Sequence, residues 1–397
     1  MTENRKTPKL RFKGFTDAWE QRKLGEFTIS YSGGTPSVGI KEYYNGQIPF
    51  IRSAEINSEI TELFLTEEGL KNSSARLVDV GDILYALYGA TSGEVGRARL
   101  KGAVNQAILV IKPHKEYDSE FLTNWLRKSK ESIVETYLQG GQGNLSGTIV
   151  KELLVCSPSH REQEEIGSFF YNLDNLITLH QRKLDRLKNI KKSMLDKMFP
   201  KDGEVVPEIR FKGFTDAWEQ RKLGELALFN PKDELPKIFE YVDLESVVGT
   251  EMLSHRTETK SSAPSRAQRV ARIGDLFYQT VRPYQKNNYL FEKPYKNFVF
   301  SNGYAQMRPF VDGYFMLCLV QSERFIKIVL DNCTGTSYPS INSNNLEEIE
   351  VYAPLNKKEG NKIGTMFRSI DNLITLHQRK LDKLKNIKKS MLDNMFV

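Results

Sequence analysis

Apolar residues recur at steps of three and four along two long stretches of the chain. In the first they fall at Ile166, Phe169, Phe170, Leu173, Leu176, Ile177, Leu184, Leu187, Ile190, Met194 and Met198. In the second they fall at Ile363, Phe367, Ile370, Leu373, Ile374, Leu381, Leu384, Ile387, Met391 and Met395. This spacing places each set on one face of a helix. Pro158 and Pro354 precede the stretches and Pro200 follows the first, so the pattern predicts two helices of about 60 Å each.

A helical stripe of that length needs an apolar partner, and each stripe is the natural partner of the other. We therefore expect an antiparallel two-helix coiled coil that acts as a spacer. His180 and His377 lie on the stripes, where packing or hydrogen bonding is a more natural role than ligand binding. The expected interface consists of Ile166, Phe170, Leu173, Ile177, Leu184, Leu187, Met194, Ile363, Phe367, Ile370, Ile374, Leu381, Leu384 and Met391.

The helices belong to an internal repeat. Residues 11–26 read RFKGFTDAWEQRKLGE, and residues 210–225 repeat them without a change. Residues 174–199 and 371–396 differ only at Arg186/Lys383 and Lys197/Asn394. The intervening stretches share an outline, such as GDILY at 81–85 against GDLFY at 274–278, and little else. Drift after a duplication would spread differences evenly, so this alternation indicates a fixed frame that carries two variable domains.

The expected fold is α+β, with two α/β domains joined by the helix pair and related by a pseudo-two-fold repeat. The first domain is expected at 1–158, the central helix at 159–200, the second domain at 201–354 and the C-terminal helix at 355–397. A chain of 397 residues suits this division.

The variable domains carry loops rich in Gly, Asn, Gln, Arg and aromatic residues, including YGATSGEVG at 88–96 and QTVRPYQKNN at 279–288. Asn and Gln can pair twice with an adenine edge and Arg with guanine, whereas glycine permits close backbone approach. A turn or a solvated side chain is the ordinary reading of any one of these residues, but the set favours DNA contact. The candidates are Thr35, Tyr44, Arg52, Tyr88, Thr91, Ser92, Asn105, Gln106, Gln142, Asn144, Arg266, Arg269, Arg282, Tyr284, Lys286, Asn287, Asn302, Tyr338 and Asn342.

Charge and composition fit this interpretation. The formal charge is +7 with a pI of about 9.0, which suits a polyanionic partner. The three cysteines, Cys156, Cys318 and Cys333, have no metal-ligand spacing and favour reduced thiols. The polar N-terminus has no signal core, and no apolar run approaches a membrane span, so we expect a cytoplasmic protein without a membrane partner.

Motifs for autonomous catalysis are not found in the sequence. An amino-methyltransferase needs an Asn/Asp-Pro-Pro-aromatic loop, and the Asn230-Pro231-Lys232 segment breaks that pattern. No GxxxxGK[ST] phosphate-binding loop occurs. Asp243, Glu258 and Lys260 could be fitted to a metal-dependent nuclease pattern, but only in one half of the chain. We therefore expect a non-catalytic protein with no catalytic, cofactor-binding or metal-binding residue of its own.

The duplicated HQRKLDxLKNIKKSML helices, the GGTPS segment, the GDIL…YGATSG run and the APSRAQR…TVRPYQKN run resemble DNA-specificity (S) subunits of type I restriction–modification enzymes. The resemblance covers essentially the whole chain. It implies that each recognition domain reads one half of a bipartite double-stranded DNA site, while the helices set the gap and dock two methyltransferase (M) subunits. It also implies two motor–nuclease (R) subunits, with S-adenosylmethionine, ATP and magnesium used by these partners.

One alternative remains open from the sequence. A coiled-coil scaffold with two ligand-binding heads that do not bind DNA would show the same repeat. The basic pI and the polar loops argue against it, and loss of DNA binding after mutation of either head's loops would discriminate between the two.

Overall fold

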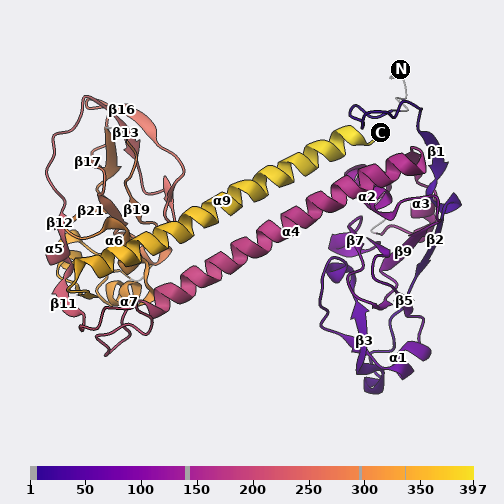
Figure 1. Cartoon of the computed structure of the whole chain (residues 1–397), viewed down its shortest axis with the longest axis horizontal. Coiled ribbons are helices and arrows are strands. Elements are labelled where there is room, and N and C mark those ends of the chain that lie inside the picture. Colours follow the sequence, from indigo (N-terminus) through magenta and orange to yellow (C-terminus); the bar gives the residue numbers. More distant parts are fainter. Residues whose placement is uncertain (1–6, 139–143, 295–296, 336) are drawn as a thin grey trace. The chain divides into compact units, whose positions relative to one another are not determined.

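The computed structural model describes residues 7–138, 144–294, 297–335 and 337–397. Contacts divide the chain into two compact units: unit 1 takes residues up to 180 together with 380–397, and unit 2 takes 181–379. Each unit therefore contains part of both long helices, α4 (His160–Lys197) and α9 (Lys357–Met395) (Figure 1). Both helices begin and end within a few residues of the predicted stretches.

Unit 1 is built from two four-stranded sheets and a two-stranded ribbon. One sheet has the order β2 (Thr28–Ser32), β9 (Ile108–Pro113), β6 (Ile83–Ala86), β7 (Val95–Arg97). The other has the order β4 (Phe64–Leu65), β3 (Tyr44–Ile51), β8 (Gly102–Val104), β5 (Arg76–Val78), in which β3 and β8 are parallel. The ribbon pairs β1 (Glu20–Lys23) with β10 (Leu154–Ser157), and the short helices and α2 complete the body: α1 (Glu67–Lys71), α2 (Ser119–Leu138) and α3 (Gly147–Lys151).

Unit 2 repeats the two four-stranded sheets and the ribbon in the same strand order. Its sheets have the orders β12 (Ala227–Phe229), β21 (Tyr304–Pro309), β18 (Leu276–Gln279), β19 (Tyr289–Leu290) and β16 (Arg256–Thr259), β13 (Ile238–Val242), β20 (Phe298–Ser301), β17 (Ala267–Val270). The ribbon is β11 (Glu219–Lys222) with β22 (Glu350–Ala353). A small hairpin and four further helices complete it: β14 (Val247–Val248), β15 (Glu251–Met252), α5 (Leu223–Leu226), α6 (Gly313–Gln321), α7 (Glu323–Asp331) and α8 (Ser343–Glu347). Two sheet-rich units and long helices confirm the expected fold class.

The repeated residues are the ones that join each body to the helices. Phe396, near the end of α9, lies in the core of unit 1, with its ring 5.3 Å from Phe121 and 5.7 Å from Phe170. Phe199, its counterpart at the end of α4, packs in unit 2 at 5.7 Å from Phe315 and 5.8 Å from Trp218. The near-identity of the repeats therefore preserves one docking geometry at two places.

Two equivalent ion pairs hold the first turns of the long helices. Arg11 makes two hydrogen bonds with Glu162, at 2.6 and 2.7 Å, and Arg210 makes two with Glu359, at 2.6 and 2.8 Å. Both carboxylates are buried, with 1% of each side chain exposed. Burying a carboxylate is costly unless a cation pairs with it, which explains why the arginine is kept in both copies of the segment.

Within each unit the two helices run in opposite directions. In unit 1, Asp174 of α4 pairs with Lys388 of α9, and in unit 2, Lys191 of α4 pairs with Asp371 of α9 at 2.7 Å. Seven of the expected interface residues are buried and the others are half-buried; the detailed coiled-coil geometry stays a prediction. The buried members are Ile166, Phe170, Leu173, Leu184, Ile363, Phe367 and Leu381.

Candidate nucleic-acid interface

A polar cleft of about 470 Å³ opens in unit 2 where β18 and β20 end. Val281, just beyond β18, forms a bridge with Ser340, and Asn302 occupies the tight turn between β20 and β21. The backbone N–H of Asn302 donates to the carbonyl of Arg266 at 2.7 Å, which fixes the two residues side by side. The cleft thus brings together three predicted residues: Arg266, Asn302 and Asn342.

The lining of this cleft suits the edges of nucleobases. Arg266 is exposed and has no acidic partner among the residues that the structure describes. Asn342 caps α8, because its side-chain oxygen accepts from the N–H of Asn345 at 2.7 Å. Five further polar residues of the lining were not among the candidates: Thr280, Asn332, Thr334, Ser340 and Asn345. Thr280 lies within the QTVRPYQKNN segment at 279–288, and Ser340 and Asn345 lie within three residues of the candidate Asn342. No sequence signal marked Asn332 and Thr334.

The loop from residue 281 to 288 is held rigidly beside this cleft. Arg282 and Lys286 both have left-handed backbones, with φ of 52° and 56°, on either side of the single turn Pro283–Gln285. Non-glycine residues adopt this conformation at a cost and only when their surroundings impose it. The Arg282 N–H donates to the carbonyl of Pro339 at 2.8 Å, and its guanidinium lies 4.4 Å from the centre of the Tyr338 ring.

The predicted residues of this loop therefore divide into two groups. Tyr284 and Tyr338 are exposed and Arg282 is half-buried; these three remain candidates for DNA contact. Lys286 instead binds Glu323 at 2.7 Å and the carbonyl of Gln321 at 3.2 Å, and Asn287 accepts from the N–H of Gly249 at 2.8 Å. These last two side chains hold the loop in place.

Arg269 also lies apart from the cleft lining. Its side chain is half-buried, and its Nε donates weakly to the carbonyl of Tyr304 at 3.4 Å. Burial lowers the pKa of this guanidinium. An arginine in this position supports the sheet more directly than it reaches a ligand.

Unit 1 gathers a different set of residues at the equivalent strand ends. Tyr88 follows β6 and bridges Asn144, while Asn105 turns the chain between β8 and β9 with its side-chain oxygen accepting from the N–H of Ala107 at 3.1 Å. Thr35 donates to the side-chain oxygen of Gln106 at 2.7 Å, and both residues are exposed. Gln142 lies outside the described residues.

Three other predicted residues of unit 1 are turned inward. Ser92 is buried and donates to the carbonyl of Leu87 at 3.3 Å. Thr91 donates to the carbonyl of Tyr88, also at 3.3 Å, and the Tyr44 hydroxyl donates to Pro36 at 2.6 Å. These contacts shape the loops around the strand ends.

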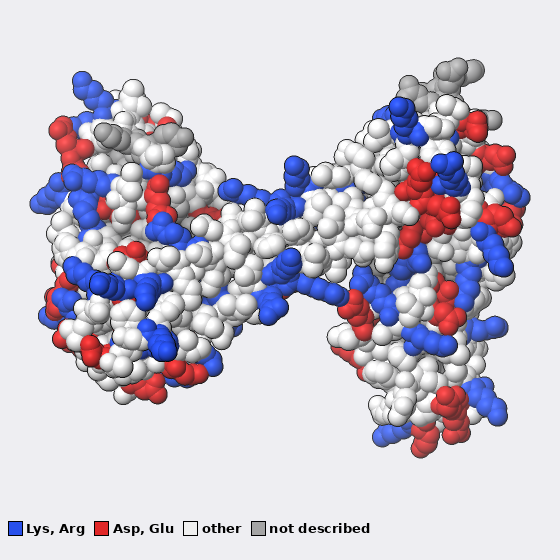
Figure 2. All heavy atoms as spheres, viewed as in Figure 1, with Lys and Arg blue, Asp and Glu red and all other residues white. Residues whose placement is uncertain are grey.

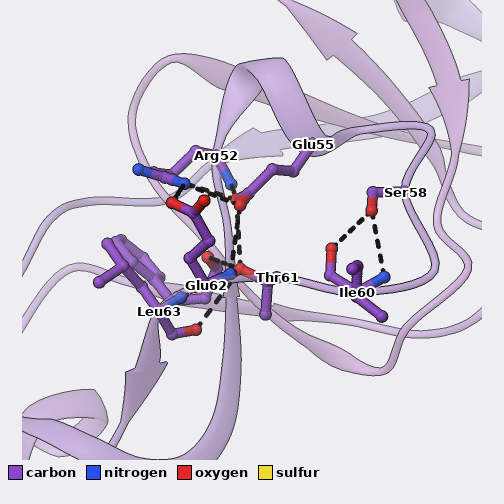
Figure 3. Close-up of polar contacts among 8 residues, drawn as sticks. Arg52, Glu55, Ser58, Ile60, Thr61, Glu62 and Leu63 are labelled. Atoms are coloured by element: carbon purple, nitrogen blue, oxygen red, sulfur yellow. Dashed lines mark hydrogen bonds and ion pairs between the residues drawn. The ribbon is translucent and has the colours of Figure 1, made fainter. Parts of the chain in front are cut away.

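Arg52 is engaged by two carboxylates (Figure 3). Its guanidinium binds Glu55 at 2.8 and 3.1 Å and Glu62 at 2.7 Å, and its backbone N–H donates to Glu55 at 3.0 Å. Burial would raise the pKa of Glu55, but the hydrogen bonds from Arg52 and from the backbone of Glu62 lower it to about 2. This cluster makes Arg52 a brace for the loop that ends at Leu63.

Within the residues that the structure describes, no cluster of three or more His, Cys, Asp or Glu side chains could hold a metal ion. In the same part of the chain, no helix is both long and apolar enough to cross a membrane.

Comparison with known proteins identifies the family. A family model described as the type I restriction modification DNA specificity domain matches residues 16–189 and 257–386. The chain is 22% identical over 412 residues to the type I restriction enzyme MjaVIII specificity subunit of Methanocaldococcus jannaschii, which covers 94% of this chain and 91% of that protein. It is 28% identical over 222 residues to the MjaIX specificity subunit of the same organism, over 52% of this chain and 51% of that one.

The fold is also found among solved structures. The crystal structure of the S subunit of a type I restriction–modification system from M. genitalium matches with a TM-score of 0.63 and 17% identity, and covers 98% of this chain and 99% of that one. At this identity the likeness concerns the fold alone. The family model, however, covers well over half of the residues, and the chain therefore belongs to the type I restriction modification DNA specificity domain family.

Proposed function

We propose that this chain is the DNA sequence-recognition subunit of a type I restriction–modification complex, and that each of its two sheet-rich bodies reads one half of a bipartite site. The observation that carries the proposal is the pair of dissimilar polar loop clusters placed at equivalent strand ends of one repeated scaffold. A shared scaffold with different side chains is what two different half-sites require. The recognition domains are those expected at 1–158 and 201–354.

The chemistry of the unit 2 cleft supports direct base reading. Arg266 supplies a guanidinium that can bind guanine at two atoms, and Asn302 supplies an amide that can bind adenine at two atoms. The rigid loop beside the cleft adds Arg282 and Tyr284. Fixed side chains lose little conformational entropy on binding, so their discrimination between bases is sharper.

The long helices support the proposed assembly. Leu176 and Leu179 of α4 and their repeat counterparts Leu373 and Leu376 of α9 are 44–46% exposed. Exposed apolar side chains that recur in both repeats suit two copies of one protein partner. We assign this surface to the two M subunits, which would bind S-adenosylmethionine; two R subunits, which would use ATP and magnesium, complete the complex. The chain itself would catalyse no step, and it would act in the cytoplasm.

The helices would also act as the spacer between the two half-sites. Each long helix contributes residues to both units, so in this proposal the length of the helices would set the length of the unread gap. Lengthening both helices by about one heptad adds about 10 Å and should widen the unread gap while leaving both half-sites unchanged. An unchanged gap would refute the spacer role.

A matched pair of variants tests the reading role of the cleft. Arg266→Ala with Asn302→Ala should reduce discrimination in one half-site only, at about 1–3 kcal/mol for each lost base contact. Lys237→Ala, an exposed lysine of the same unit outside the cleft, is the control for lost charge. Binding is measured by competition with duplexes altered in either half-site. Equal loss of discrimination at both half-sites would contradict the assignment.

A further inference from the structure

Each unit has a cleft between its body and the long helices, which in unit 2 is separate from the polar cleft described above. The cleft of unit 1 has a volume of about 410 Å³ and that of unit 2 about 1110 Å³. In unit 1 its floor consists of Asp174, Ile177, Thr178 and Lys388. In unit 2 the floor contains the repeat counterparts of all four: Asp371, Ile374, Thr375 and Lys191. These two "helix clefts" therefore share one floor.

The walls of the helix clefts come from the variable bodies and differ. Arg127 of α2 lines the cleft in unit 1, and Gln321 of α6 lines it in unit 2. The two positions correspond, because each lies six residues after a phenylalanine, Phe121 or Phe315, whose backbone N–H is bound by an aspartate cap. A ligand bound in either cleft would therefore contact the same floor residues but different wall residues.

Both helix clefts have a surplus of positive charge. Four basic and two acidic side chains line the one in unit 1, and seven basic and five acidic side chains line the one in unit 2. In unit 1 a single carboxylate, Asp174, serves both Arg127, at 3.0 Å, and Lys388. Burial, and after it the nearby Arg127, lowers the pKa of Lys388. An anion in this cleft would be attracted by both cations.

In unit 2 the surplus includes two exposed lysines, Lys188 and Lys192, for which the described part of the chain shows no acidic partner. Lysine and arginine side chains are also prominent along the long helices in Figure 2. Unpaired ammonium groups beside a cleft attract phosphate groups without regard to base sequence.

The helix clefts are distinct from the exposed leucines. At 3.6 residues per turn, Leu176 and Leu179 lie about half a turn around α4 from Asp174. Leu373 and Leu376 lie in the same way relative to Asp371. On both long helices, the face that lines the clefts carries charged residues and the opposite face carries the exposed leucines. The proposed phosphate-binding surface is therefore separate from the proposed protein-binding surface.

We propose that the two helix clefts hold the sugar–phosphate backbone of the DNA. The proposal rests on the DNA-binding function proposed above and assigns the sequence-independent part of that binding to specific residues. Its basis is that the backbone is the part of the DNA that is alike in both half-sites, as the floor is alike in both clefts. The base edges differ between half-sites and belong with the variable loops.

The repeat provides a matched control for the test. Lys188 and Lys192 line the helix cleft of unit 2, whereas their counterparts Lys385 and Lys389 are exposed in the same local sequence, KNIKKSM, but do not line the cleft of unit 1. The variants K188Q/K192Q and K385Q/K389Q remove equal charge from the same local sequence, inside a helix cleft in the first case and outside one in the second. For each, in the full chain assembled with its methyltransferase partner, the DNA affinity is measured as a function of salt concentration.

Of the two lysine variants, only K188Q/K192Q is expected to change the salt dependence. Each lost phosphate contact lowers the slope of log affinity against log salt by about 0.9, so K188Q/K192Q should lower it by about 2 and K385Q/K389Q should leave it unchanged. Arg127→Gln, which copies the residue of unit 2, should lower it by about 1. Half-site discrimination should be preserved in all three.

Three results would overturn the proposal. Equal slopes in the two lysine variants would reduce the effect to net charge. An unchanged slope with weaker retention of the methyltransferase would assign the clefts to the protein partner. Loss of sequence discrimination would assign them to base reading. Absence of DNA binding by the wild-type complex would instead refute the proposed function, so the two failures are distinguishable.

Discussion

Removing Arg11 should destabilise unit 1 strongly, because it leaves a carboxylate buried without its cation. Glu162 has 1% of its side chain exposed and receives two hydrogen bonds from Arg11. Breaking a buried pair in this way costs about 3–5 kcal/mol. Glu162 lies in the first turn of α4, where the helix dipole returns roughly 0.3–1 kcal/mol, so we expect a loss of about 3 kcal/mol for Arg11→Ala.

The assay separates the units by their tryptophans. Trp19 and Trp125 lie in unit 1 and Trp218 lies in unit 2. In a unit of this size about 3 kcal/mol corresponds to a fall in Tm of about 6–12 °C. Arg11→Ala should lower the Tm of the transition reported by Trp19 and Trp125. Arg210→Ala, its repeat counterpart, should lower the Tm of the transition reported by Trp218.

A double variant tests the reasoning itself. Replacing both partners with methionine, as R11M/E162M, removes the buried charge together with its cation and should recover most of the lost stability. A loss below about 1 kcal/mol in Arg11→Ala, or a double variant no more stable than the single one, would refute the view that an uncompensated buried carboxylate causes the effect.

Three further predictions concern other contacts of the two units. Phe396→Ala should cost unit 1 about 3–5 kcal/mol, measured by the same transition, because the ring is 4% exposed among Trp19, Phe121 and Phe170; a loss below about 1 kcal/mol would contradict that role. Glu55→Gln should lower the free energy of unfolding by about 2 kcal/mol near neutral pH, a figure reduced to allow for the partial exposure of Arg52. The pKa of Glu55 falls from 4.5 to about 2 on folding, so wild-type stabilisation is complete above about pH 4.5 and is lost as pH falls towards 2; denaturation curves in which the difference between wild type and variant does not shrink would contradict this. A circular permutant that opens at Gly203 and joins the original ends should fold and bind DNA, because Leu10 donates to the carbonyl of Asn394 as Ile209 donates to that of Lys197, each at 2.9 Å; an unfolded permutant would show that chain order matters.

The long helices could be predicted from sequence because their signal is local. Stripes of apolar residues bounded by Pro158, Pro200 and Pro354 define α4 and α9 to within a few residues. The stripe is wider than the buried face, however. Leu176 and Ile190 belong to the pattern, yet they are 46% and 37% exposed.

The division into units could not be predicted in the same way, since it depends on contacts between distant residues. Nothing in the local pattern shows that residues 380–397 pack with the N-terminal body, because Phe396 meets Trp19 and Phe121 only in the folded chain. The repeat gave one indirect indication of this packing, because Trp19 and Phe396 both lie in repeated segments.

The candidate site was predicted in outline but not side chain by side chain. Arg266, Asn302 and Asn342 came together because the motifs that carry them lie at neighbouring strand ends. Arg52 and Lys286 looked equally available in the sequence, but Glu62 and Glu323 bind them in the structure. The partners that occupy a charged side chain are set by tertiary contacts, which residue type and spacing do not reveal.

A methylome tests the central claim most directly. The chain is expressed with its methyltransferase partner in a host free of DNA methylation, and modified adenines are mapped by single-molecule sequencing. The account predicts a split motif, with two short half-sites around a fixed gap of unread bases. A continuous motif would contradict two reading bodies, and the absence of methylation from an assembled complex would contradict DNA recognition by this chain.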